Sequence, residues 1–294
     1  MTTKIQTSWT PARSKIIACI GDSLTHNNTL GTCADEFYTE QAAVALRALG
    51  CNVKGVNFGS SGDTTGQMLS RVSKMTLQGT PTVAVIYGGI NDAQYATTAQ
   101  ASPSPTSTVF TVGAGLGTNY KPGTYITVGG VTAQILSVAT DAITLTAALP
   151  GGAPAAGTAV AIDTQTNLTQ IGLYIKNTIG CSRIIVGGMH YYNFSSGGDT
   201  VGTPLPANVA LRAKQSAAAT AIGAVYVNFW QVMADRITAG TDTQGSYSWH
   251  VLDSNVHLNG WRSAPTGKSS GESILAAAIV SAIQAQSGWV AALT

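Results

Sequence analysis

Blocks of apolar residues alternate with amphipathic stretches along most of the chain. Apolar runs of about six residues predict buried strands, and stretches with apolar positions three or four residues apart predict helices. Alternation of this kind predicts a parallel sheet with helices on both faces. The predicted strands are 15–20, 53–58, 82–87, 183–188 and 225–229, and the predicted helices are 34–49, 67–75, 168–179, 207–222 and 273–285. The residues expected on the buried face of helix 34–49 are Phe37, Ala42, Val44, Ala45 and Ala48.

Residues 101–164 interrupt this alternation. The segment is rich in Thr, Gly, Ala and Pro, and its apolar residues recur at every second position, as strands require. Gly129-Gly130 between Val128 and Val131 is a hairpin signal. A long disordered linker is the alternative, but the apolar content and the turn spacing favour folded structure. We therefore expect an α/β domain from 1–100 and 165–294, with 101–164 inserted as a small β-rich module.

Four groups of polar and small residues are expected at the carboxyl ends of strands or in loops at the same edge. Each has an ordinary structural interpretation when taken alone, as a turn, a strand-to-helix connection, a cap or a loop histidine. Their occurrence together favours a functional site, because ligands bind at the carboxyl ends of strands in open α/β sheets. The groups are Gly21-Asp22-Ser23, Asn57 to Thr64, Gly89-Ile90-Asn91-Asp92 and Asp253 to His257.

These four groups, in this order, resemble the four sequence blocks of the SGNH hydrolases, also called the GDSL esterase/lipase family. The resemblance covers 15–91 and 167 to the end of the chain, and it implies a flavodoxin-like three-layer sandwich and a serine esterase. It assigns Ser23 as the nucleophile and His257 as the general base. It also implies that the backbone N–H groups of Ser23 and Gly62 and the side chain of Asn91 form the oxyanion hole.

The third member of a triad is the point at which this chain departs from the family. The family places an Asp three residues before the His, where this chain has Ser254, whereas Asp253 lies four residues before His257. Positions three and four apart share a face on a helical turn, so Asp253 could still orient the imidazole. A Ser–His dyad is the alternative.

Several further residues could contact substrate. Asp22 precedes the nucleophile. His190 follows a predicted strand, and a loop histidine satisfied by its neighbours is at least as good an interpretation of it as a substrate contact; His26, just after the nucleophile, has the same two interpretations. No cluster of His, Cys, Asp or Glu indicates a metal, and no cofactor is expected. Cys19, Cys51 and Cys181 adjoin apolar runs and are expected in the core, whereas Cys33 is expected to be exposed.

Composition limits the classes of partner. Charged residues make up 10% of the 294 residues and the formal net charge is +2, so no basic cluster offers a nucleic-acid surface. No stretch is long and apolar enough to span a membrane, and the first residues do not resemble a signal peptide. The uncharged polar surface favours an extracellular or virion-associated location, and the Thr/Gly/Ala-rich insert resembles the small β modules of phage tail proteins. Oligomeric state cannot be inferred.

The substrate is expected to be an ester of carbohydrate. The chain lacks a long apolar lid, which disfavours a lipase, and the polar insert begins just after Asn91. The resembled family includes many members that remove acetyl groups from carbohydrates, and together with these features the resemblance favours a carbohydrate O-acetylesterase. The alternatives are a lipase or thioesterase acting on short acyl esters, and a non-catalytic glycan-binding virion protein that retains the fold.

Overall fold

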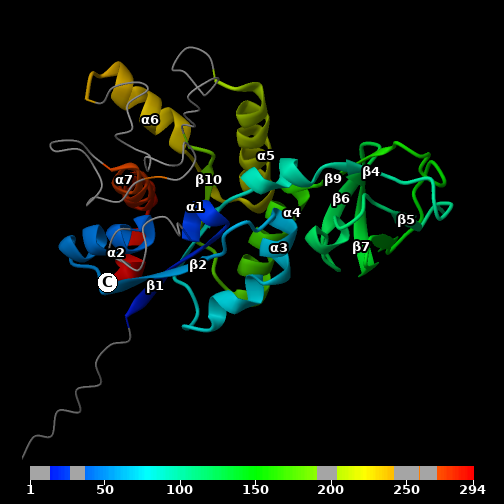
Figure 1. The fold of residues 1–294 in the computed structure, drawn as a ribbon. Coiled ribbons are helices and arrows are strands. Elements are labelled where there is room, and N and C mark those ends of the chain that lie inside the picture. Colours follow the sequence, from blue (N-terminus) through cyan, green and yellow to red (C-terminus); the bar gives the residue numbers. More distant parts are fainter. Residues whose placement is uncertain (1–13, 27–36, 191–203, 242–257, 259–269) are drawn as a thin grey trace, which may run out of the picture.

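A five-stranded parallel sheet forms the centre of the molecule in the computed structural model (Figure 1). The structure describes residues 14–26, 37–190, 204–241, 258 and 270–294. The strand order is β11-β10-β3-β1-β2, which is the flavodoxin-like order of a doubly wound sheet. The strands are β1 (Lys15–Gly21), β2 (Val53–Gly59), β3 (Val83–Tyr87), β10 (Ile184–Gly188) and β11 (Val225–Asn228). The predicted α/β class and parallel sheet are therefore confirmed.

Helices cover both faces of this sheet. The residues of β1 alternate between the two layers: Ile17 and Cys19 join one hydrophobic cluster, whereas Ile16, Ala18 and Ile20 join the other. The first cluster is completed by α2 (Tyr38–Ala48), α6 (Phe229–Thr238), α7 (Gly271–Ala285) and α8 (Trp289–Leu293). The second is completed by α3 (Thr65–Ser70), α4 (Thr164–Tyr174) and α5 (Pro206–Ile222). Burial of both faces explains why the central strands are continuously apolar.

The buried face of α2 differs from the prediction. Tyr38, Thr39, Ala42, Ala43 and Leu46 are buried, whereas Val44, Ala45 and Ala48 are exposed. The largest apolar side chains, at positions 38 and 46, are separated by two helical turns, and they determine which stripe faces the sheet. Of the residues expected on the buried face, only Ala42 is fully buried, and Phe37 is partly buried at the N-cap just before the helix.

Two helix boundaries also differ from the expected ones. Helix α3 begins at Thr65 because the Thr64 side chain accepts from Gln67 N, while the Gln67 side chain accepts from Thr64 N. This reciprocal pair is a capping box. Helix α4 continues into a wider π turn at Ile175–Ile179, so the predicted stretch 168–179 contains two kinds of helix.

A second, antiparallel sheet is built from residues between β3 and α4. Its order is β4-β9-β6-β7-β8-β5, and it encloses its own hydrophobic cluster around Phe110, Ile126 and Ile135. Val128 pairs with Val131, as expected for a hairpin at Gly129-Gly130. The strands are β4 (Thr97–Thr98), β5 (Val109–Thr111), β6 (Tyr125–Val128), β7 (Val131–Ala139), β8 (Ala142–Leu145) and β9 (Ala159–Ile162).

The second sheet lies beside the helices α3 and α4 (Figure 1). The first and last strands of this sheet along the chain are neighbours, because Thr97 of β4 pairs with Val160 of β9. Asn167 of α4, which is wholly buried, joins it to the helical layer: its side chain accepts from Tyr125 N and donates to Tyr125 O, both at 2.9 Å. Whether residues 101–164 form a separately folding module stays a prediction. Among the described residues, no helix is both long and apolar enough to cross a membrane.

Candidate active site

Ser23 lies immediately beyond the carboxyl end of β1. The strand ends at Gly21, and Ser23 begins the short helix α1 (Ser23–His26) with a partly exposed side chain. A Cβ atom on Gly21 would lie 2.0 Å from both Thr25 Oγ1 and Tyr87 O. Only glycine therefore allows the chain to turn this closely into the helix. The turn places the predicted nucleophile at the edge of the sheet.

The loop that carries Gly62 begins level with the end of β1. Gly21 pairs with Gly59, the last residue of β2, and Ser60 N donates to Gly21 O at 3.0 Å. Gly62 is exposed and has φ of +80°, a left-handed conformation that favours glycine. The backbone N–H groups of Ser23 and Gly62 donate no hydrogen bond to any described residue. Two backbone donors therefore remain available at this edge.

Asn91 comes from the third strand end and reaches this loop. It lies in the turn after β3, and its side chain is 7% exposed. Asn91 Nδ2 donates to Asp63 O at 2.9 Å, and its Oδ1 accepts from Gln94 at 3.3 Å. An amide nitrogen carries two hydrogens, so one remains beyond the bond to Asp63. The structure thus places Asn91 beside the loop of Gly62.

Asp22 joins the first and third strand ends from inside the protein. Its side chain is wholly buried, with Oδ1 accepting from Leu24 N at 2.9 Å and Oδ2 from Gly89 N at 2.8 Å. Burial raises the pKa of Asp22 to about 7, although these hydrogen bonds partly oppose the shift. A side chain without exposed surface cannot contact substrate. We therefore correct the expectation for Asp22, which holds the strand ends together instead.

Asp92 ties Asn91's turn to the start of α3. Its carboxylate accepts from Thr65 N at 2.8 Å and from Thr65 Oγ1 at 2.6 Å. Burial raises the pKa of Asp92 to about 6, and the hydrogen bonds from Thr65 oppose that shift. The carboxylate also satisfies the first N–H of the helix, a group that has no partner within the helix itself. The turn and the helix are consequently held in one arrangement.

Arg71 is a residue of this edge that sequence reasoning missed. Its Nε lies 2.5 Å from Asp63 Oδ2, its Nη1 donates to Phe58 O at 2.5 Å, and its Nη2 donates to Gly21 O at 2.6 Å. One guanidinium therefore joins the end of β1, the end of β2 and the loop of Gly62. Asp63 directly follows Gly62 in a recognised block, but no pattern in the sequence relates Asp63 to Arg71.

The two histidines considered as substrate contacts differ in burial. His190 is wholly buried, and its Nδ1 is hydrogen-bonded to the hydroxyl group of Tyr87. A buried ring paired within the core cannot contact substrate, so we correct that expectation. His26 is partly exposed, and its Nδ1 lies 3.2 Å from Ser61 Oγ, next to Gly62.

The remaining assignments fall elsewhere in the chain. His257 and Asp253 lie outside the described residues, as does Cys33. The other three cysteines are buried, as expected. Within the part of the chain that the structure describes, no group of three His, Cys, Asp or Glu residues could hold a metal ion.

A hollow of about 320 Å³ lies beside Asn91. Its walls come from the turn after β3, from strand β9 and from helix α5. Most lining groups are small or apolar, including Ile90, Ala161 and Leu211, whereas Lys214 supplies a positive charge. The antiparallel sheet therefore forms one wall of this hollow, whereas Ser23, Gly62 and Asn91 are not among its lining residues.

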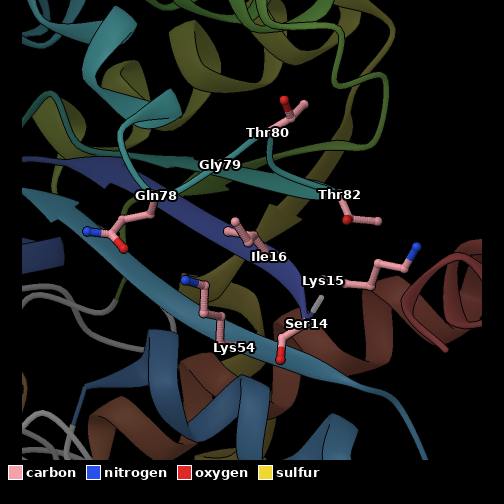
Figure 2. Close-up of a pocket in the computed structure, with 8 residues that line it drawn as sticks. All are labelled: Ser14, Lys15, Ile16, Lys54, Gln78, Gly79, Thr80 and Thr82. Carbon is pink, nitrogen blue, oxygen red and sulfur yellow. The ribbon is translucent and has the colours of Figure 1, made fainter. Parts of the chain in front are cut away.

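Another hollow, of about 500 Å³, lies at the opposite end of the parallel sheet. It is lined by residues at the amino ends of β1 and β2, including Lys15 and Lys54. Figure 2 shows the Lys54 side chain pointing toward Gln78, whereas the Lys15 side chain points away from both. Because parallel strands all run in one direction, this hollow is separated from Ser23 by the length of β1.

Comparison with known proteins agrees with the arrangement of the strand ends. Residues 19–260, more than half of the chain, match the model of the GDSL-like lipase/acylhydrolase family. The chain belongs to this family, and it is a carboxylic ester hydrolase. A search of curated proteins finds no significant match.

Solved structures with low sequence identity share the fold. A variant of an acetyl xylan esterase from Geobacillus stearothermophilus has a TM-score of 0.52 and 15% identity, covering 91% of this chain and 94% of its own. A psychrotrophic esterase from Pseudoalteromonas sp. has a TM-score of 0.50 and 14% identity, covering 92% of this chain and 97% of its own. At these identities, the similarity concerns the fold alone.

Proposed function

We propose that this protein is a serine esterase that uses Ser23 as nucleophile and His257 as general base, with Asp253 orienting the histidine. The oxyanion hole consists of the backbone N–H groups of Ser23 and Gly62 and the side chain of Asn91. The observation that supports the proposal is that Ser23, the loop of Gly62 and Asn91 follow three strand ends at the same edge of the sheet, with Asn91 bonded to that loop. Neither backbone N–H is used by a described residue, and Asn91 retains one amide hydrogen.

The reaction follows from these roles. Ser23 Oγ attacks the ester carbonyl carbon while His257 removes the hydroxyl proton, and the carbonyl oxygen becomes an oxyanion held by the three donors. The tetrahedral intermediate collapses by breaking the bond to the alcohol oxygen, which receives the proton from His257. Water then attacks the acyl-enzyme with His257 again accepting a proton, and the carboxylic acid is released as Ser23 recovers its hydrogen.

We further propose that the substrate is an O-acetylated carbohydrate. The antiparallel sheet and the turn that carries Asn91 line one hollow together, which supports a role for that sheet in substrate contact. The acetyl xylan esterase named above provides a related precedent on the same fold. The sparse charge of the chain supports an extracellular or virion-associated setting. A lipase or thioesterase for short acyl esters is the alternative, as is a glycan-binding virion protein without activity.

An ester panel tests this proposal. Wild type, Ser23→Ala and His257→Ala are compared on p-nitrophenyl esters from acetyl to long-chain acyl, and on acetylated polysaccharides. We expect highest activity on acetyl esters, release of acetate from at least one polysaccharide, and loss of most turnover in both variants. Near-wild-type activity of either variant would overturn the mechanism. Preference for long acyl chains would favour a lipase, and inactivity on every ester would favour the binding protein.

A further inference from the structure

A third hollow lies between the antiparallel sheet and the helical layer. It has a volume of about 350 Å³ and lies between β6, β7, α3 and the end of α4. The polar side chains that line it are Tyr125, Gln134, Gln170, Tyr174, Asn177 and Thr178. None of its lining residues carries a charged side chain. The hollow therefore combines aromatic rings, amides and hydroxyl groups without any ionic group.

The two tyrosines are available to a ligand. Tyr125 and Tyr174 are both partly buried, and neither hydroxyl group is hydrogen-bonded to a residue that the structure describes. A tyrosine presents an apolar ring together with a polar tip, and it can contact a ligand at little cost in conformational entropy. The rings can therefore contact a flat apolar surface while the hydroxyl groups supply hydrogen bonds.

The frame around the hollow is held by specific bonds. Asn167 binds both backbone groups of Tyr125, which fixes the strand that carries this ring. Gln134 Nε2 donates to Gly123 O at 3.1 Å, and this bond orients the Gln134 amide at the rim. On the other side, the π turn at Ile175–Ile179 carries Asn177. Turns of this type occur frequently at functional sites.

The hollow is also linked to the catalytic edge. Leu69 lines it from α3, and the same helix begins at Thr65, which is bonded to Asp92 next to Asn91. Thr65 and Leu69 are four residues apart, or roughly 6 Å along a helix. The frame of the hollow is therefore connected through α3 to the turn that carries Asn91.

We propose that this hollow is a subsite for an uncharged sugar ring of a glycan chain. A sugar ring offers an apolar C–H face for Tyr125 and Tyr174, and hydroxyl groups for the amides of Gln134, Gln170 and Asn177. The lack of charged lining groups disfavours anionic ligands, for which opposite charge gives the strong contacts. The part of the inference that concerns turnover of a polymer rests on the proposed esterase function, whereas sugar binding does not.

Binding is tested first with the full chain in a Ser23→Ala background. The probe is an array of neutral oligosaccharides, including xylan, mannan and N-acetylglucosamine oligomers. We expect at least one to bind, and Tyr125→Ala, Tyr174→Ala and Gln170→Ala each to weaken that binding about fivefold to tenfold. Tyr125→Phe retains the ring and removes only the hydroxyl group, so it should weaken binding less than Tyr125→Ala does. It also serves as a variant that is less prone to misfold. Gln165→Ala is the matched control, since Gln165 is an exposed residue of α4 outside the hollow.

Turnover is tested next with Ser23 intact. We expect the three alanine variants to hydrolyse p-nitrophenyl acetate like wild type, but to release acetate several-fold more slowly from the polysaccharide that binds. Absence of any binding on the array, or binding that the variants retain, would overturn the subsite. If binding depends on the tyrosines but no polysaccharide is deacetylated, the subsite stands and the carbohydrate esterase proposal fails.

Discussion

Arg71 and Asp63 form a mostly buried ion pair, with Nε 2.5 Å from Oδ2, directly beside the predicted oxyanion hole. Arg71 also donates to the backbone carbonyl of Gly21, two residues before Ser23. Asp63 follows Gly62, and its own backbone carbonyl accepts from Asn91. This ion pair therefore connects the segments that carry Ser23, Gly62 and Asn91, which are the three parts of the predicted oxyanion hole. An oxyanion hole is effective only when its donors are already in place.

Arg71→Lys should therefore lower kcat by about tenfold or more, because a single ammonium group cannot reproduce the planar fork of three contacts. KM should change less, and circular dichroism should show a retained fold. Arg71→Ala should recover part of its kcat when guanidinium ions are added. Arg47→Lys is the matched control, since its pair with Glu40 lies at the surface. A lower melting temperature with unchanged kcat would reduce Arg71 to a structural role.

Asn91→Ala should lower kcat by about 10²–10³-fold while KM changes little, because the amide is expected to act on the oxyanion. Asn119→Ala provides the comparison: its Nδ2 donates to Leu116 O in the antiparallel sheet region, away from Ser23. Steady-state kinetics on p-nitrophenyl acetate measure both variants. A change confined to KM in Asn91→Ala would contradict the assigned role.

The variant Asp253→Asn tests whether catalysis uses a Ser–His–Asp triad or a Ser–His dyad. If Asp253 orients His257, the amide would favour the wrong imidazole tautomer and could not stabilise the imidazolium, so kcat should fall by several orders of magnitude. If a Ser–His dyad operates, the loss should stay below about tenfold, or ~1.4 kcal/mol in the barrier. Ser254→Ala is the control at the position where the family usually has its Asp.

Ionisation of the buried Asp22 carboxyl group should make the folded protein less stable as pH rises. Burial raises the pKa of Asp22 to about 7 and that of Asp92 to about 6, against an ordinary value of 3.8. Between about pH 4 and pH 7 the folded state consequently binds more protons than the unfolded state. The free energy of unfolding therefore gains a contribution at low pH that is lost as pH rises through the folded pKa values.

Urea titrations of wild type and Asp22→Asn at pH 5 and pH 7.5 measure this contribution. The decline in unfolding free energy between the two pH values should be smaller in Asp22→Asn, by on the order of 2 kcal/mol. Asp235→Asn, at an exposed helix position, should keep the wild-type decline. The same slope in all three proteins would show that Asp22 does not titrate in this range.

Excision of the antiparallel sheet tests its independence. Because Thr97 pairs with Val160, a short linker should join the chain on either side of the sheet without strain. The shortened protein should fold cooperatively and hydrolyse p-nitrophenyl acetate, while losing activity on polymeric substrate. Thermal unfolding and both assays measure the outcome. Failure to fold would mean that contacts such as those of Asn167 make the sheet part of the main core.

The sequence by itself determined the parallel sheet, and it predicted where the candidate site lies. Apolar runs in β1 and β3 predict buried strands because burial on both faces leaves no polar alternation, and that signal is local. The blocks around Ser23, Gly62 and Asn91 were recognisable for the same reason, since each is contiguous in the chain. The Thr64–Gln67 capping box was also local, but its signal was not used, so α3 was expected to begin too late.

Only the tertiary structure decided which of the side chains near the strand ends are accessible and which are buried. Asp22 and His190 follow or adjoin strand ends just as Ser23 does, yet both are enclosed by neighbouring elements. Arg71 meets Gly21 across 50 positions because β1 and β2 end level with each other. Burial and pairing at such separations depend on how distant elements pack together, and no periodicity within a single segment records that packing.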